Sequence, residues 1–267
     1  MSKPDAVSFL EAFLSRDPRW HDRSHLSDTT QDEIDSKYNI DFPEKGKCLI
    51  INMENFSNGL LPRPGTDKDA NSLQEVFGKI GFAVQIEKDI TQNQYNTVVQ
   101  KVAREDHSKR GGFVCVILSH GELNGFYVKD ALIKYDNLFN NFKGDGCKTL
   151  VGKPKLFFIQ ACRGGQIDHG AIVCSKEAEE NVTIIPKEAD NLYHYSTPPG
   201  YLAWRSPVNG SWFIQTLCEM LKKYWMEYEL LQILTYVNKS VAYQCQTPTG
   251  GKQMPYMVST LTKRLFL

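Results

Sequence analysis

Short, nearly continuous apolar runs alternate along the chain with segments whose apolar residues recur at helical spacing. Six runs predict strands, at 47–53, 82–89, 113–120, 153–162, 191–195 and 256–267. Four periodic segments predict helices, at 73–80, 95–102, 213–221 and 230–237, and a shorter one at 9–14 ends before Asp17-Pro18. Strands that are apolar throughout indicate a sheet whose two faces are both covered.

The alternation of strands and helices predicts an α/β fold, with helices on both faces of a mostly parallel sheet. In such sheets the reacting groups collect at the carboxyl ends of the strands. Two of the predicted strands end in His120 and Cys162. If these strands are neighbours, the imidazole and the thiol lie at the same edge.

Composition narrows the class of protein. The 267 residues include 31 basic and 31 acidic ones, so no overall charge attracts nucleic acid or an anionic membrane. The chain opens without a signal peptide pattern, and it has no apolar run near the ~20 residues of a spanning helix. We therefore expect a cytoplasmic protein with no nucleic-acid or membrane partner.

The cysteines favour a reducing compartment. There are seven of them, an odd number, scattered and without a CxxC pair, which argues against both a disulfide framework and a zinc site. We expect no metal and no cofactor. Most cysteines in such a chain are small buried apolar residues, but one of them can be a nucleophile.

His120 and Cys162 are suited to nucleophilic catalysis. A free thiol has a pKa of about 8.5, and a nearby imidazole raises the reactive fraction and later protonates the leaving amine. The backbone N–H groups of Gly121 and Cys162 can point at a developing oxyanion. Taken singly, a cysteine at a strand end is more often a core residue, and a lone histidine is more often a structural or surface group.

The pentapeptide Gln160-Ala161-Cys162-Arg163-Gly164 matches the cysteine signature of caspases. The resemblance covers roughly residues 45–267. It also includes Ser119-His120-Gly121 and the segments 63–67, 152–165, 200–205 and 210–213. The chain resembles an effector-type caspase, with some features of the initiator group.

This resemblance implies a caspase-like sandwich with a central six-stranded sheet, a homodimer, and apoptotic cleavage of proteins after aspartate. It implies that Cys162 is the nucleophile, His120 the acid and base, and the N–H groups of Gly121 and Cys162 the oxyanion hole. Arg63, Gln160 and Arg205 then form the pocket for the substrate aspartate. Two guanidiniums and an amide suit a short carboxylate, because they offer several charge-assisted donors. Trp204 and Trp212 match the aromatic walls of the S2 and S4 subsites.

The resemblance also divides the chain. It implies a propeptide at 1–35, a large subunit at 36–168, a linker at 169–189 and a small subunit at 190–267. Residues 32–35 resemble a tetrapeptide that effector caspases cleave, so we expect removal of the propeptide after Asp35. The linker contains no aspartate. We therefore expect activation by a route other than cleavage after aspartate within it.

Three departures from the effector pattern concern the substrate pocket. The segment 244–251 is shorter than the aromatic-rich loop typical of effector members, while Leu202 and Ser206 replace other residue types. We expect strict aspartate at P1, with both acidic and aliphatic residues accepted at P4.

Two other functions stay open from the sequence. The first is a catalytically latent caspase homologue that acts as a binding or regulatory partner. The second is a metacaspase, which cuts after basic residues; that pocket needs acidic side chains where this chain has Arg63 and Arg205.

Overall fold

The computed structural model describes residues 36–166, 186 and 188–267. The chain separates into two units, Met1–Ser36 and Lys37–Leu267, and the helices and strands of the described residues lie in the second. The helix expected at 9–14, the cleavage site at Asp35 and nearly all of the linker expected at 169–189 lie outside the described residues.

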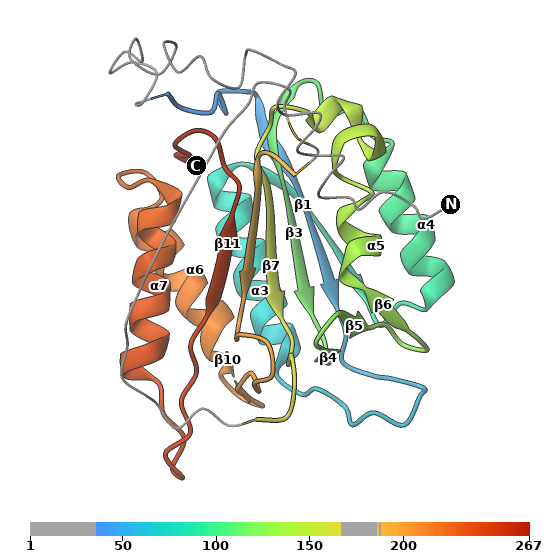
Figure 1. Ribbon diagram of the computed structural model, residues 1–267, viewed down its shortest axis with the longest axis vertical. Coiled ribbons are helices and arrows are strands. Elements are labelled where there is room, and N and C mark those ends of the chain that lie inside the picture. Colours follow the sequence, from blue (N-terminus) through green and yellow to red (C-terminus); the bar gives the residue numbers. More distant parts are fainter. Residues whose placement is uncertain (1–35, 167–185, 187) are drawn as a thin grey trace, which may run out of the picture. The chain divides into compact units, whose positions relative to one another are not determined.

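A six-stranded sheet forms the centre of the second unit (Figure 1). Its strands, in spatial order, are β11 (Tyr256–Ser259), β8 (Asn191–Tyr195), β7 (Lys155–Gln160), β3 (Arg110–Leu118), β1 (Glu44–Asn52) and β2 (Phe82–Lys88). Neighbouring strands run parallel, except that β11 runs antiparallel to β8. The prediction of a mostly parallel α/β sheet is confirmed.

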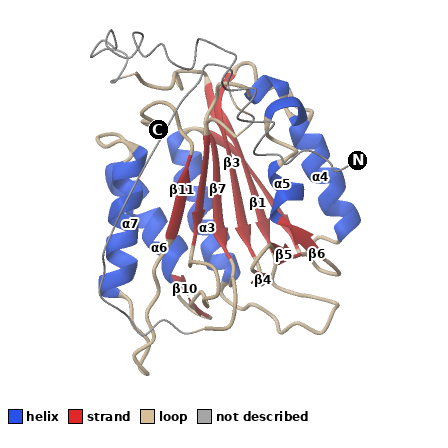
Figure 2. Ribbon diagram, viewed as in Figure 1, coloured by secondary structure: helices blue, strands red, loops and turns tan. Residues whose placement is uncertain are grey.

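Helices cover both faces of this sheet (Figure 2). One face packs against α3 (Thr66–Ile80), α6 (Trp212–Tyr224) and α7 (Leu230–Gln244), and the other against α4 (Gln92–Ala103) and α5 (Tyr135–Phe139). Along β1, Ile50 belongs to the first apolar cluster, whereas Leu49 and Ile51 belong to the second. Successive side chains point to opposite faces, and both faces are buried, which explains the continuous apolar run.

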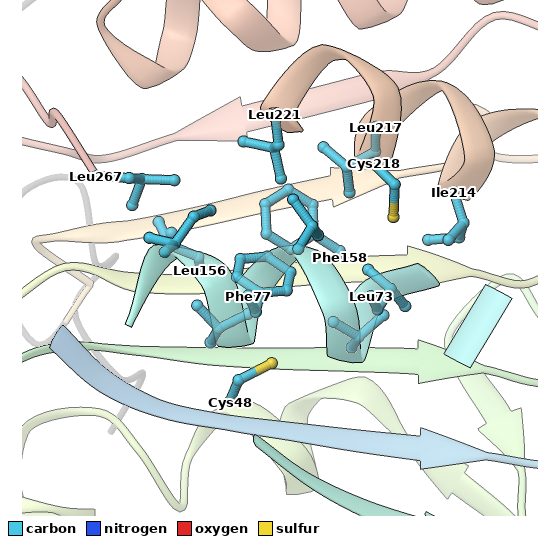
Figure 3. Close-up of a cluster of buried hydrophobic side chains, with 14 of the residues drawn as sticks. Cys48, Leu73, Phe77, Leu156, Phe158, Ile214, Leu217, Cys218, Leu221 and Leu267 are labelled. Carbon is cyan, nitrogen blue, oxygen red and sulfur yellow. The ribbon is translucent and has the colours of Figure 1, made fainter. Parts of the chain in front are cut away.

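The first cluster is held by aromatic packing between a helix and the sheet (Figure 3). Phe77 of α3 and Phe158 of β7 are both fully buried, and their ring centroids lie 6.1 Å apart. Leu73 of α3 and Leu217 of α6 are fully buried in the same cluster. Burying a side chain of this size contributes about 1.5–3 kcal/mol, so the cluster fixes the helices on the strands.

Shorter elements lie at the ends of the main strands. They are the three-stranded sheet β4 (Gly121–Glu122), β5 (Gly125–Tyr127) and β6 (Leu132–Lys134), the hairpin β9 (Arg205–Ser206) and β10 (Gly210–Ser211), and the 3-10 turns η3 (Gly144–Gly146) and η4 (Lys148–Leu150). Among the described helices none is long and apolar enough to cross a bilayer.

The predicted closing strand is wrong in its extent. We expected 256–267, and the structure ends β11 at Ser259. The reason is the length of its partner: Ser259 pairs with Leu192, and β8 begins one residue earlier, at Asn191. Beyond that point Leu265 and Leu267 return to the core. There Leu265 O accepts from Leu230 N–H, and Leu265 N–H donates to the Glu229 side chain, both at the start of α7.

His194 is a buried titratable group in this core. It lies on β8, its Nε2–H donates to Asn238 Oδ1 at 2.8 Å, and its ring packs edge-on against Phe213. Burial lowers the pKa of His194 to about 4, from an ordinary 6.5. The folded chain therefore keeps this ring neutral, whereas the unfolded chain takes up a proton below pH 6.5.

We predict that His194 weakens the fold as pH falls from 6.5 towards 4. At pH 5 the loss is about 2 kcal/mol, because 1.5 pH units separate that pH from the unfolded pKa. Urea unfolding at pH 7.5 and pH 5 measures it. His194→Leu is less stable at both values, since Asn238 loses its donor, but its midpoint falls less between them. Equal falls in the two proteins would contradict the prediction.

Candidate active site

The register of two parallel strands brings His120 and Cys162 to one edge of the sheet. Leu118 is the last residue of β3, and it pairs with Gln160, the last residue of β7. The ladder continues one step further, because Ser119 N–H donates to Gln160 O at 3.1 Å. His120 lies two residues after Leu118, and Cys162 lies two residues after Gln160. The imidazole and the thiol therefore follow the ends of two neighbouring strands.

Gly121 lies directly against the backbone that carries the thiol. A Cβ added at Gly121 would lie 2.8 Å from Ala161 Cβ and 2.8 Å from Cys162 O. Real Cβ atoms do not approach other atoms this closely, so the contact requires glycine. The main chains on either side of the site therefore touch at this residue.

The loop before α3 holds the His120 ring. The Nε2 atom lies 2.8 Å from Leu61 O, and a carbonyl only accepts, so Nε2 carries the hydrogen. In the neutral ring Nδ1 is then the free base. Phe56 packs against the same ring with centroids 5.0 Å apart.

Burial, together with the positive charges of Arg63 and Arg205, lowers the pKa of His120. The hydrogen bond to Leu61 acts in the opposite direction without reversing the shift. The imidazole is therefore neutral at pH 7, which is the form that a general base needs.

The segment 202–205 lies over the thiol. Ala203 N–H donates to Cys162 Sγ at 3.5 Å, and Ala203 O lies 4.0 Å from the same sulfur. Arg205 follows two residues later, where β9 begins. The thiol and the expected substrate-binding residues are thus adjacent.

Arg63 and Arg205 form a cationic cluster near the thiol, and Gln160 lies on β7 two residues before Cys162. Arg63 is only 3% exposed, and its Nη1 donates to Met53 O and to Thr66 Oγ1. Arg205 is half-buried and donates to Pro64 O. Gln160 is 2% exposed, and among the described residues its Oε1 has no hydrogen-bond partner.

Burial and mutual repulsion both act on the two arginines of this cluster. Burial, and secondly the charge of Arg205, lower the pKa of Arg63 to about 9. Burial also lowers the pKa of Arg205. A further carboxylate bound beside the two guanidiniums would add opposite charge and so favour their protonated forms.

Sequence reasoning missed Asp69, a fully buried carboxylate that faces both arginines. Its charge raises the pKa of each arginine, against the effect of burial. Asp69 accepts hydrogen bonds from Ser211 N at 2.9 Å and from Gln215 Nε2 at 2.8 Å. It therefore ties α3 to the hairpin that carries Arg205. In the sequence it looks like an ordinary acidic residue in the first turn of a helix.

The structure brings the other expected pocket residues to the same region. The rings of Trp204 and Trp212 lie 6.0 Å apart, and the Trp204 indole N–H donates to Lys252 O. Leu202 is partly exposed, and its N–H donates to Gln166 O. The Ser206 Oγ accepts from the N–H groups of Val208 and Asn209 in the 206–209 turn.

The Caspase domain family model matches residues 45–266 of the chain. The chain belongs to the caspase family. Caspase-3 of Xenopus laevis is 50% identical over 232 residues, which cover 86% of this chain and 82% of that protein. Caspase-3 of Mesocricetus auratus is 47% identical over 243 residues, 87% of each chain.

A solved structure agrees with these relatives. The crystal structure of caspase-1 from Spodoptera frugiperda matches with a TM-score of 0.80 at 38% identity, covering 86% of this chain and 94% of that one. This caspase is therefore an effector-type cysteine endopeptidase that cleaves proteins after aspartate.

We predict that Gly121→Ala lowers kcat about 100-fold, because the new methyl group forces the two backbones of the site apart. Steady-state cleavage of a peptide ending in aspartate measures it. The control is Gly78→Ala on α3, where an added Cβ meets nothing within 4 Å. This control keeps wild-type kcat, and a Gly121→Ala enzyme with wild-type kcat would contradict the prediction.

Proposed function

We propose that Cys162 is the nucleophile of this caspase, His120 its acid and base, and Arg63, Gln160 and Arg205 its pocket for the substrate aspartate. One observation carries the proposal. Two guanidiniums whose pKa values are lowered by burial lie beside a thiol, and an imidazole with a free Nδ1 lies at the next strand end.

In the acylation step His120 Nδ1 takes the proton of Cys162, and the sulfur attacks the scissile carbonyl carbon. The N–H groups of Gly121 and Cys162 hold the resulting oxyanion. The C–N bond then breaks, and His120 gives its proton to the departing amine. Water, deprotonated by His120, attacks the thioester, which releases the acid and restores the thiol.

The P1 preference follows from charge. An aspartate side chain neutralises two guanidiniums that are partly removed from water, whereas asparagine has nearly the same shape without the charge. An arginine adds repulsion. The same cluster argues against the metacaspase alternative, whose substrates end in a basic residue.

We predict that tetrapeptides ending in asparagine have a kcat/KM at least ~30-fold below those ending in aspartate. A fluorogenic panel ending in aspartate, asparagine or arginine measures it, with Cys162→Ala as the inactive control. Aspartate-ending tetrapeptides with aspartate or with valine at P4 differ in kcat/KM by less than ~10-fold, in line with the short 244–251 segment. Turnover after arginine would contradict the pocket, and no turnover even at high protein concentration would favour a latent homologue.

We further propose the division into 1–35, 36–168, 169–189 and 190–267. Asp190 is an unsuitable cleavage site, because it is 3% exposed and its Oδ1 accepts from Tyr38 OH at 2.6 Å and from Thr262 Oγ1 at 2.7 Å. The same contacts attach Tyr38 to the core shortly after Asp35, where we place the propeptide cut.

We propose a homodimer that pairs along β11, in the cytoplasm. Within the described sheet β11 is an edge strand, and it exposes Tyr256 and Val258. Exposed apolar edge strands are templates for pairing with another chain. The cysteines that the structure describes are all free, which is consistent with a reducing compartment.

We predict that the active enzyme shows no chain break after Asp168 or Asp190 and begins at Ser36. Mass spectrometry of the active protein, denatured and native, measures the chain ends and the stoichiometry together. Cys162→Ala prepared in the same way distinguishes self-cleavage from cleavage by another protease. A cut after Asp168 or Asp190, or a first residue other than Ser36, would contradict the prediction.

A further inference from the structure

Gln253 is a buried amide that joins two parts of the active site. It is 1% exposed and lies three residues before β11. Its Oε1 accepts from Trp204 N at 2.7 Å, and its Nε2 donates to Ser196 O at 2.9 Å. One side chain therefore spans from the end of β8 to the segment that carries the pocket residues.

Ser196 is itself fixed to the strand that carries the nucleophile. Its N–H donates to Ile159 O at 2.8 Å, and its Oγ donates to Ala161 O at 3.2 Å. Ala161 is the residue immediately before Cys162. The position of Ser196 O, the anchor of Gln253, is thus set by the backbone next to the thiol.

At its other end Gln253 holds the middle of the segment 203–205. Ala203 N–H points at Cys162 Sγ, and Arg205 pairs with Ser211 in the hairpin. Trp204 lies between these two residues, and its backbone N–H is bonded to the Gln253 amide. A shift of Trp204 therefore moves Arg205 relative to the thiol.

We infer that Gln253 is a positioning residue, which sets the distance between the thiol and the substrate-binding pair Trp204 and Arg205 without touching substrate. The inference rests on the proposed roles of Trp204 and Arg205 in substrate recognition. Both amide ends are needed, because a buried polar group is stable only when it is hydrogen-bonded and a shorter or apolar side chain cannot make both bonds.

Gln253→Met, which has a similar volume and no amide, tests the inference. The kcat/KM for an aspartate tetrapeptide falls about 10- to 100-fold, with most of the change in KM. The rate at which iodoacetamide alkylates Cys162, followed by peptide mass spectrometry, stays within about twofold of wild type, because this small reagent does not use the pocket. Gln100→Met makes the same change at an exposed position of α4 and leaves both measurements unchanged.

Gln253→Asn keeps the amide but shortens its reach. It therefore lowers kcat/KM and leaves the alkylation rate near that of wild type, and it serves as the test where Gln253→Met does not fold. Wild-type kcat/KM in the folded variants overturns the inference, and so does an alkylation rate that falls in parallel with kcat/KM. Arg205→Ala tests the proposed pocket separately from the role of Gln253. If it leaves kcat/KM unchanged, the proposed pocket is wrong; if it lowers kcat/KM and the Gln253 variants do not, only the role of Gln253 is wrong.

Discussion

The pairing of Leu118 with Gln160 across β3 and β7 is the constraint on which the site depends. A slip of one residue in a strand turns every side chain to the opposite face. Phe158 would then point into the second apolar cluster and Phe157 into the first. The two clusters differ in the helices that pack there, so neither side chain would fit its new place. The core therefore enforces the register, and the register sets where His120 and Cys162 emerge. The relative placement of His120 and Cys162 at the edge is a consequence of packing in the middle of the sheet.

The second constraint is electrostatic. Burial of Arg63, together with the charge of the half-buried Arg205 nearby, lowers the pKa of Arg63 to about 9. Asp69 offsets part of this shift, and its hydrogen bonds to the start of α6 hold the hairpin of Arg205 in place. Gly65 and Gly210 permit this approach: a Cβ at either would lie 2.4 Å or less from the opposing segment. The proposed anion pocket is thus assembled from two segments about 140 residues apart in the sequence.

The sequence predicted the sheet well because its signal is local. Continuous apolar runs such as the one in β3 indicate a strand that is buried on both faces. Helical periodicity predicted α3, α4, α6 and α7. The overlong closing strand shows the limit, since strand length depends on the partner, which the run itself does not contain. At the site, His120 and Cys162 were found from strand ends and Arg63 and Arg205 from a family pattern. Asp69, Leu61 and Gln253 act through tertiary contacts, so no local pattern marks them.

The site also depends on the contacts between two halves of the chain, the part up to Cys162 after β7 and the part from β8 onwards. His120 and Cys162 follow β3 and β7, whereas Trp204, Arg205 and Gln253 all come after β8. The halves meet in the β7–β8 ladder, five parallel pairs with buried side chains. They also meet in the hydrogen bonds from Ser196 Oγ to Ala161 O and from Tyr38 OH to Asp190. None of these contacts needs a continuous backbone between β7 and β8. The fold can therefore tolerate a chain break there. After such a break, buried hydrogen bonds still set the distance between the Cys162 thiol and the proposed pocket.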